Sequence, residues 1–184
     1  MHYHAAGLED RTGIARPGRD PVTTEQTQAA GSEDRDAIRA ELEQTRRSYH
    51  ELLGSLTREE WRRKSRNPAW TVGQLMWHLA SGIKFSADGV ERSRNGKGFN
   101  PPGLLVNPIN VLSTRIGARK ATKASVTAQY DAGHAKLLVA MEAVLDADWQ
   151  KGAKFFGRYM TVEDQLRAVK QHFDEHAADI QAVR

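Results

Sequence analysis

The sequence predicts an all-α protein, a four-helix bundle with a long crossover between its second and third helices. Apolar residues recur at steps of three and four along four long segments, which is the period of an amphipathic helix. No segment shows the strict alternation of apolar and polar residues that is typical of a half-buried strand. At 184 residues the chain has the length of one domain. We divide it into a disordered tail, 1–31, and a helical domain, 32–184.

The tail is predicted from its composition, which is rich in Gly, Thr, Gln and charged residues and has no apolar period. Pro17 and Pro21 interrupt it further. His2 and His4 form a pair of possible metal ligands there. A mobile pair lacks the preorganisation of a tight metal site, so we do not expect one at this end of the chain.

The first two long helices have clear starts. Ser32 is a good N-cap, and the apolar stripe that follows includes Ile38, Leu42 and Tyr49. Thr57 and Glu60 have the spacing of a capping box, which predicts a short helix. The second long helix begins after Thr71 and ends at Asn95-Gly96; its core stripe is Val72, Leu75, Leu79, Ile83 and Val90.

The crossover contains an apolar segment, 104–117, which we expect to be a helix broken at Pro108. Ser125 is the expected N-cap of the third long helix. The last helix starts at Thr161, with Asp164 three residues later, and runs to the C-terminus. The inward face of the third helix is Tyr130, His134, Leu137, Leu138, Met141 and Leu145, and that of the last is Val162, Leu166, Val169, Phe173, His176, Ile180 and Val183.

Composition excludes several functional classes. The chain has no cysteine, which excludes disulfides, iron–sulfur clusters, cysteine-ligated zinc and a cysteine nucleophile. It has no run of eighteen apolar residues, so we expect no membrane-spanning helix. The N-terminus lacks the apolar stretch of a secretory signal, and we expect a cytoplasmic protein. The net charge of +4 is far below that of a typical nucleic-acid-binding domain, and nucleic acid is not the expected partner.

Three histidines are candidate metal ligands. His172 and His176 are four residues apart on the last helix, so their rings lie one turn apart and about 40° from each other around the axis. Two imidazoles at this spacing can bind one divalent ion. His78 lies at the edge of the core stripe of the second helix, and in a bundle facing helices can converge on one ion. The open alternative is that these histidines are hydrogen-bonded core residues without a metal.

Two further histidines have weaker cases. His134 faces inward and could be a fourth ligand, a partner of a ligand, or an acid–base group; a core histidine with an ordinary hydrogen bond is the simpler interpretation. His50 lies off the apolar stripe of its helix, and we expect it to be solvated. Trp77, next to His78, is a candidate wall of the metal pocket, and Glu175 and Asp179 could orient the imidazoles.

The segment from Pro68 to Leu79, PAWTVGQLMWHL, and the C-terminal segment from His172 to Ile180, HFDEHAADI, resemble two motifs of the DinB/YfiT-like family. The resemblance covers roughly residues 33–184. It implies a four-helix bundle with a divalent metal bound by His78, His172 and His176. It also implies relatives that include thiol-dependent transferases and isomerases, such as those that use mycothiol, and it implies a homodimer.

The function expected from these residues is that of a metal-dependent enzyme with a small-molecule substrate. Zn²⁺, Ni²⁺ and Fe²⁺ all suit three histidines, and such an ion activates water or a thiol. Because the chain has no cysteine, the thiol would come from a low-molecular-weight cosubstrate. A second possibility is a stress-associated bundle that binds a metal or ligand without turnover. Segment 92–123 has no acid and could bind substrate carboxylates or be a solvated basic loop; its cations are Arg92, Arg94, Lys97, Arg115, Arg119, Lys120 and Lys123.

Overall fold

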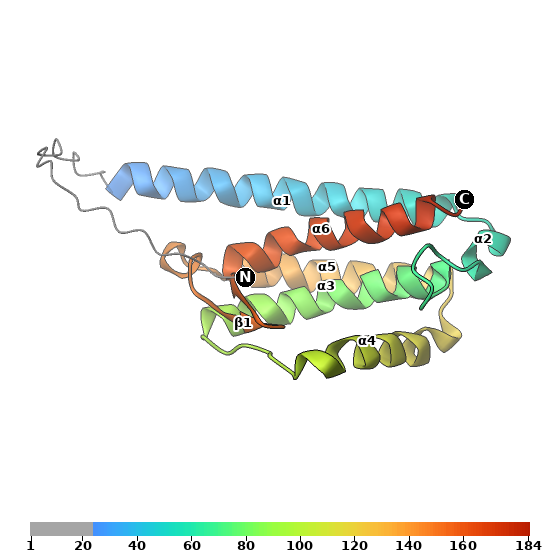
Figure 1. Cartoon of the computed structure of the whole chain (residues 1–184). Helices are drawn as coiled ribbons and strands as arrows, with labels where there is room; N and C mark the ends of the chain where they lie inside the picture. Colours follow the sequence, from blue (N-terminus) through green and yellow to red (C-terminus); the bar gives the residue numbers. More distant parts are fainter. Residues whose placement is uncertain (1–23) are drawn as a thin grey trace, which may run out of the picture.

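Four long helices form the bundle in the computed structural model, which describes residues 24–184 and their side chains from residue 34 onward (Figure 1). They are α1 (Thr24–Ser55), α3 (Val72–Arg94), α5 (Lys123–Glu142) and α6 (Val162–Gln181). Helix α3 packs against α5 and α6, and α1 contacts the same two helices from the other side. The predicted helical bundle is therefore confirmed, with one small two-stranded sheet beside it.

Helix α1 starts earlier than expected, at Thr24 rather than after Ser32. Residues 1–23, with His2 and His4, lie outside the described part of the chain. The division into a tail, 1–31, and a domain, 32–184, thus stays a prediction, although the helix already includes the last residues assigned to the tail.

In the described part of the chain, threonine capping boxes begin four helices, and at three of them a threonine cap was expected. The helices α2 (Arg58–Arg62), α3 and α6 are capped as expected by Thr57, Thr71 and Thr161. The side chain three residues after each threonine completes the box: Glu60, Gln74 and Asp164. Helix α5 is capped by Thr122, not by Ser125 as predicted. The Ser125 side chain instead accepts a hydrogen bond from the backbone N–H of Thr122, as the third residue of the same box.

The crossover between the second and third long helices holds α4 (Gly103–Gly117), followed by a 3-10 turn, Ala118–Lys120. We expected a break at Pro108, but the helix is continuous. Pro108 lies in the second turn, where the only intrahelical bond it removes is the one to the carbonyl of Leu104. Leu104 is 92% exposed, so water can reach this end of the helix.

A two-stranded antiparallel hairpin precedes α6, where we expected only a linker. Strand β1 (Gly152–Phe155) pairs with β2 (Arg158–Thr161), and Phe155 opposite Arg158 closes a two-residue loop. Both loop residues have positive φ, 50° at Phe156 and 84° at Gly157. This is the geometry of a type I′ turn, which usually carries Asn-Gly, so the sequence Phe-Gly did not suggest a hairpin.

The core lies between the four long helices, as the stripes predicted. Ile38, Leu75 and Leu166 are fully buried, and the Tyr49 hydroxyl donates to the Met76 carbonyl across α1 and α3. Leu145 is an exception: α5 ends at Glu142, and Leu145 is exposed beyond it. None of the helices among the described residues has the length and apolar character needed to cross a membrane.

Candidate metal centre

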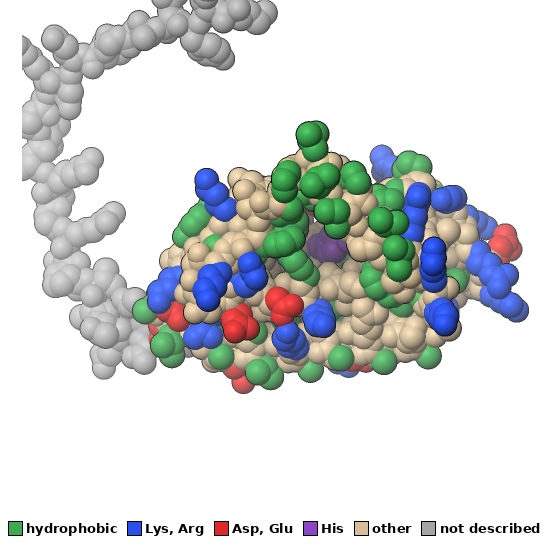
Figure 2. All heavy atoms as spheres, turned by 90° about the horizontal axis from the view of Figure 1, so that it is seen from below, with side chains coloured by type: hydrophobic (Ala, Val, Ile, Leu, Met, Phe, Trp, Pro, Cys, Tyr) green, Lys and Arg blue, Asp and Glu red, His purple; other side chains and the backbone are tan. Residues whose placement is uncertain are grey.

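Three histidines from two helices converge at one point near α4. His78 comes from α3, and His172 and His176 come from successive turns of α6. One ring nitrogen of each lies within 4.8 Å of one from each of the others, and the Nε2 atoms of His78 and His172 are 3.0 Å apart. Among the described residues, these three side chains bring their possible ligand atoms close enough together to bind one metal ion. A histidine is visible in a hollow of the face seen from below in Figure 2, between hydrophobic side chains.

The rings of His78 and His176 have neighbours on three segments. The Thr114 hydroxyl of α4 lies 3.3 Å from His78 Nδ1, and Trp70 stacks on the His78 ring with centroids 4.8 Å apart. Asp179 Oδ2 lies 3.6 Å from His176 Nδ1. A neighbour that accepts the proton of Nδ1 leaves the Nε2 lone pair of the same ring free for a metal.

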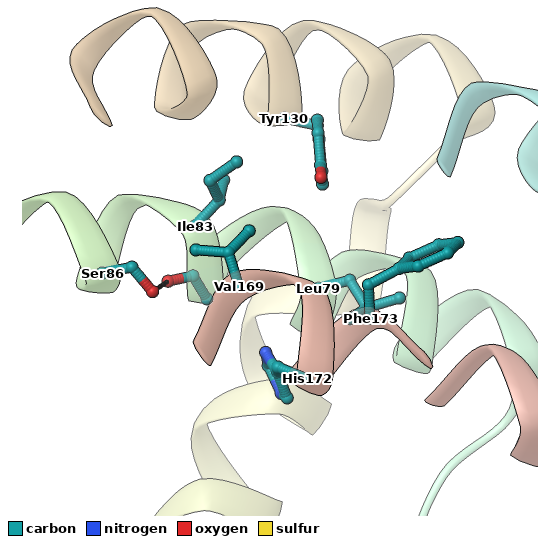
Figure 3. Close-up of a pocket in the computed structure, with 8 residues that line it drawn as sticks. Leu79, Ile83, Ser86, Tyr130, Val169, His172 and Phe173 are labelled. Atoms are coloured by element: carbon teal, nitrogen blue, oxygen red, sulfur yellow. Dashed lines mark hydrogen bonds between the residues drawn. The ribbon is translucent and has the colours of Figure 1, made fainter. Parts of the chain in front are cut away.

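Glycine makes room for the third ring. The His172 ring packs directly over Gly82 of α3, where a Cβ would lie 2.8 Å from its Cε1 and 3.0 Å from its Nδ1. Figure 3 shows His172 at one edge of a cavity whose other labelled walls come from α3, α5 and α6. The close approach of α3 and α6 therefore depends on the absence of a side chain at residue 82.

Burial keeps the three imidazoles neutral. Desolvation, with repulsion from His172 and His176, lowers the pKa of His78 from its usual 6.5 to about 3. Desolvation and the His176 charge lower the pKa of His172 to about 4. The pKa of His176 is also lowered by burial, against the opposing effect of Asp179. Neutral imidazole is the form that binds a metal, so these ligands need no deprotonation near pH 7.

The residues present fit a divalent ion. Two Nε2 atoms face each other at 3.0 Å, close to the separation of roughly 3.3 Å expected for two histidines on a tetrahedral ion with bonds of about 2.0–2.1 Å. His176 Nδ1 is buried, and Asp179 Oδ2 lies 3.6 Å away, just beyond hydrogen-bond distance, so a small turn of the ring toward an ion would complete that bond. Three neutral nitrogen donors suit Zn²⁺, Ni²⁺ and Fe²⁺.

The lowered pKa values predict the pH dependence of the metal-free protein. Between about pH 6.5 and pH 4 the unfolded chain binds protons at His78 and His172 that the folded chain does not, so acid favours unfolding. We expect the free energy of unfolding in EDTA to fall from pH 7 to pH 5 by up to about 1.4 kcal/mol per pH unit for each histidine. Urea titrations measure this. His172→Ala should flatten the slope, and an equal slope in both proteins would contradict the prediction.

The other candidate residues lie elsewhere. His134 is buried against α1, with its Nε2 3.7 Å from Glu43 Oε1, and is not one of the histidines brought together. His50 is not solvated as expected: it is half-buried, and its Nε2 lies 2.8 Å from Asp131 Oδ1. Glu175 is exposed and accepts a hydrogen bond from Gln171. Trp70, rather than Trp77, forms the aromatic wall.

Several cations of segment 92–123 have structural partners. Arg115 donates to the Ala69 carbonyl, Arg92 to the Gly98 carbonyl, and Lys123 to the Leu56 carbonyl at the end of α1. Arg94 forms an ion pair with Asp148. These contacts account for four of the seven cations as links between segments. Lys97, Arg119 and Lys120 are exposed.

Sequence reasoning missed two residues that shape the centre. Thr114 lies 36 residues from His78 in the chain, on a helix that we expected to be broken, so no spacing pattern connects the two. Gly82 could have been suspected from its position one turn after His78 on a helix that packs closely, because a glycine inside a helix normally costs stability.

The fold and the site together define a helical bundle with a candidate three-histidine metal centre. The family model of the DinB superfamily matches residues 41–180. The chain belongs to this superfamily, and the expected family is confirmed.

Two solved structures share the fold. They are a mycothiol-dependent maleylpyruvate isomerase and a variant of that enzyme with one histidine replaced by alanine. For each, the TM-score is 0.64 and the identity 16%, and the match covers 79% of this chain and 60% of the other. The chain therefore spans less than two thirds of that enzyme's length, and the likeness shows the fold alone. A comparison with curated proteins gave no match.

Proposed function

We propose that this protein is a metal-dependent enzyme that acts on a small-molecule substrate, with one divalent ion held by His78, His172 and His176. The observation that carries the proposal is the convergence of three neutral imidazole nitrogens within 4.8 Å. Three protein ligands leave at least one position for water or substrate, which is the pattern of a catalytic site rather than a structural one.

The bound ion would supply Lewis acidity, which lowers the pKa of a water or a thiol and makes it a nucleophile near neutral pH. The chain's own residues would prepare this chemistry. Thr114 and Asp179 orient the rings of His78 and His176, and Trp70 restricts water on one side of His78. The chain has no cysteine, so a thiol nucleophile would come from a cosubstrate. The mycothiol dependence named for the isomerase of similar fold supports a thiol of low molecular weight.

Metal analysis of the purified protein tests this function. We expect about one divalent ion per chain, lost on dialysis against a chelator and restored by Zn²⁺, Ni²⁺ or Fe²⁺. A protein that takes up none of these ions contradicts the proposal. If the ion binds, hydrolysis and thiol-transfer assays on the protein and on His172→Ala separate an enzyme from a bundle that only binds metal, since only an enzyme loses turnover.

The protein is also proposed to form a homodimer through the outer face of α4. Thr114 faces His78 on the inner side, while an apolar stripe with steps of four, three and four lies on the opposite side. No element in the described part of the chain covers that stripe. Arg115, the one charged residue of α4, is turned to the Ala69 carbonyl, so two copies can meet without opposed charges on the stripe. The stripe consists of Leu105, Ile109, Leu112 and Ile116, each at least 50% exposed.

Replacement of Leu112 by Asp should dissociate this dimer. A charge at the centre of an apolar helix pair would be buried without a partner, and we expect the dissociation constant to rise by at least about tenfold. Light scattering at micromolar concentration measures the molar mass. Val139→Asp, at a 70% exposed position on α5, is the matched control and should remain dimeric. A wild-type protein that is monomeric at these concentrations would rule the interface out.

A further inference from the structure

Three phenylalanine rings form an exposed cluster on the same side of α3 as His78. Phe85 of α3, Phe99 of the loop after α3, and Phe156 of the hairpin turn pack edge-to-face or tilted, with centroids 5.5–5.9 Å apart. They are 40%, 42% and 45% exposed. Together these residues are called the phenylalanine cluster below. Large apolar side chains that gather on the surface of a protein mark binding sites more often than single ones do.

The cluster lies within reach of the histidine centre. Phe85 follows His78 by seven residues, which is two helical turns, about 10 Å along the axis and about 20° around it. Gly82 lies between them on the same face and contributes no side chain. The His172 ring, which belongs to the centre, packs over Gly82 and so extends the centre along this face toward Phe85. A small molecule bound at the centre could therefore contact both.

The cluster is held in place before any ligand binds. The Phe99 N–H donates to the Lys154 carbonyl, and the Phe156 N–H donates to the Phe99 carbonyl, so the loop and the hairpin are joined. The backbone N–H of Gly157 donates to the Asn100 side chain. At Gly98 the loop approaches the hairpin so closely that a Cβ would lie 2.1 Å from the Lys154 carbonyl oxygen. These contacts fix two of the three rings against the third.

Phe156 occupies a position that local stability does not favour. Its φ of 50° is left-handed, which is uncommon and strained for a bulky residue. Asn is the residue preferred at this place in a type I′ turn. The phenylalanine at this position thus strains the turn, and its ring is nearly half exposed to solvent. This combination indicates that the ring itself has a function.

We propose that the phenylalanine cluster binds the apolar arm, aryl or alkyl, of a small-molecule substrate whose polar head binds at the histidine centre. The inference rests on the proposed function for the position of the head. The cluster adds the substrate class: a molecule with an apolar group about 10 Å from the reacting atom.

Hydroxamates test the proposal, because their head groups chelate divalent ions and their arms can be varied. The probes are acetohydroxamate and 4-phenylbutyrohydroxamate, titrated calorimetrically into the Zn²⁺-loaded protein. We expect the phenyl compound to bind at least about tenfold more tightly. In Phe156→Asn this preference should fall about three- to tenfold, while acetohydroxamate binds as before. The melting temperature of Phe156→Asn should be unchanged or higher, because Asn relieves the strained turn.

Leu145→Asn, which removes an exposed apolar side chain outside the cluster, is the matched control and should keep the full preference. An equal preference for the phenyl compound in Phe156→Asn and wild type would overturn the proposal. So would a change of molar mass in Phe156→Asn, which would assign the cluster to a contact between copies.

A failure of the proposed function gives a different result. If neither hydroxamate binds any variant, the metal centre is wrong, and the cluster is then tested by anilinonaphthalene sulfonate fluorescence on the metal-free protein. Binding reduced in Phe156→Asn but not in Leu145→Asn would support the cluster as an apolar site. Equal binding in both variants would overturn it.

Discussion

His78→Ala should abolish stoichiometric metal binding while the protein stays helical. This substitution removes the only ligand from α3 and leaves the two ligands of α6, and a two-histidine site binds far more weakly than a three-histidine site. We expect metal content to fall from about one ion per chain to less than about a tenth. Wild type should gain thermal stability on addition of metal, and the variant should gain none. Inductively coupled plasma analysis and circular dichroism measure the two quantities.

The matched control is His50→Ala, since His50 is a half-buried histidine whose partner is Asp131 and which lies outside the three-histidine cluster. It should retain the metal. Equal metal content in His78→Ala and wild type would show that the ion binds elsewhere. Loss of metal in both variants would point to general instability.

Gly82→Ala should weaken metal binding although it replaces no ligand. The new Cβ would lie 2.8 Å from Cε1 of His172, closer than carbon atoms pack, so the ring must leave its place. Loss of a residue that positions a metal ligand typically costs about 10- to 100-fold in metal affinity, and we expect an effect of this size. Competition with a chelator of known affinity measures it.

Gly89→Ala is the control for this change, because Gly89 lies two turns further along the face of α3 that meets α6. Its Cβ would meet the side-chain end of Gln165, a group that can move aside. This variant should bind metal like wild type. If Gly82→Ala and Gly89→Ala bind the metal equally tightly, the position of the His172 ring does not depend on the absence of a side chain at residue 82.

The sequence predicted the parts of the fold that depend on local patterns. Helix starts at Thr71 and Thr161 follow from a threonine with a polar side chain three residues later, and the buried stripes follow from the 3.6-residue period. The convergence of His78 with the α6 pair could be predicted because bundle helices face one another and the spacing matched a known family. Its supporting residues could not, since the contact of Thr114 with His78 depends on where the crossover packs.

The errors have physical causes as well. Pro108 was expected to break its helix, but α4 is continuous: the proline leaves the carbonyl of Leu104 without its helical partner, and water can reach this residue because it is 92% exposed. The hairpin escaped prediction because Phe156 replaces the residue that normally identifies its turn. His50 was assigned to solvent from its helix face, and its pairing with Asp131 of another helix has no local signature.

The threonine caps also determine where the histidine rings lie along their helices. His78 follows the Thr71 cap by seven residues, and His172 follows the Thr161 cap by eleven. The number of residues between cap and histidine therefore sets the position of each ring along its helix and the direction in which it points. One inserted residue in either interval would turn the ring by about 100° and raise it by about 1.5 Å. Such an insertion would therefore carry the ring away from the other two, whose ring nitrogens now lie within 4.8 Å, although it would replace none of the three histidines.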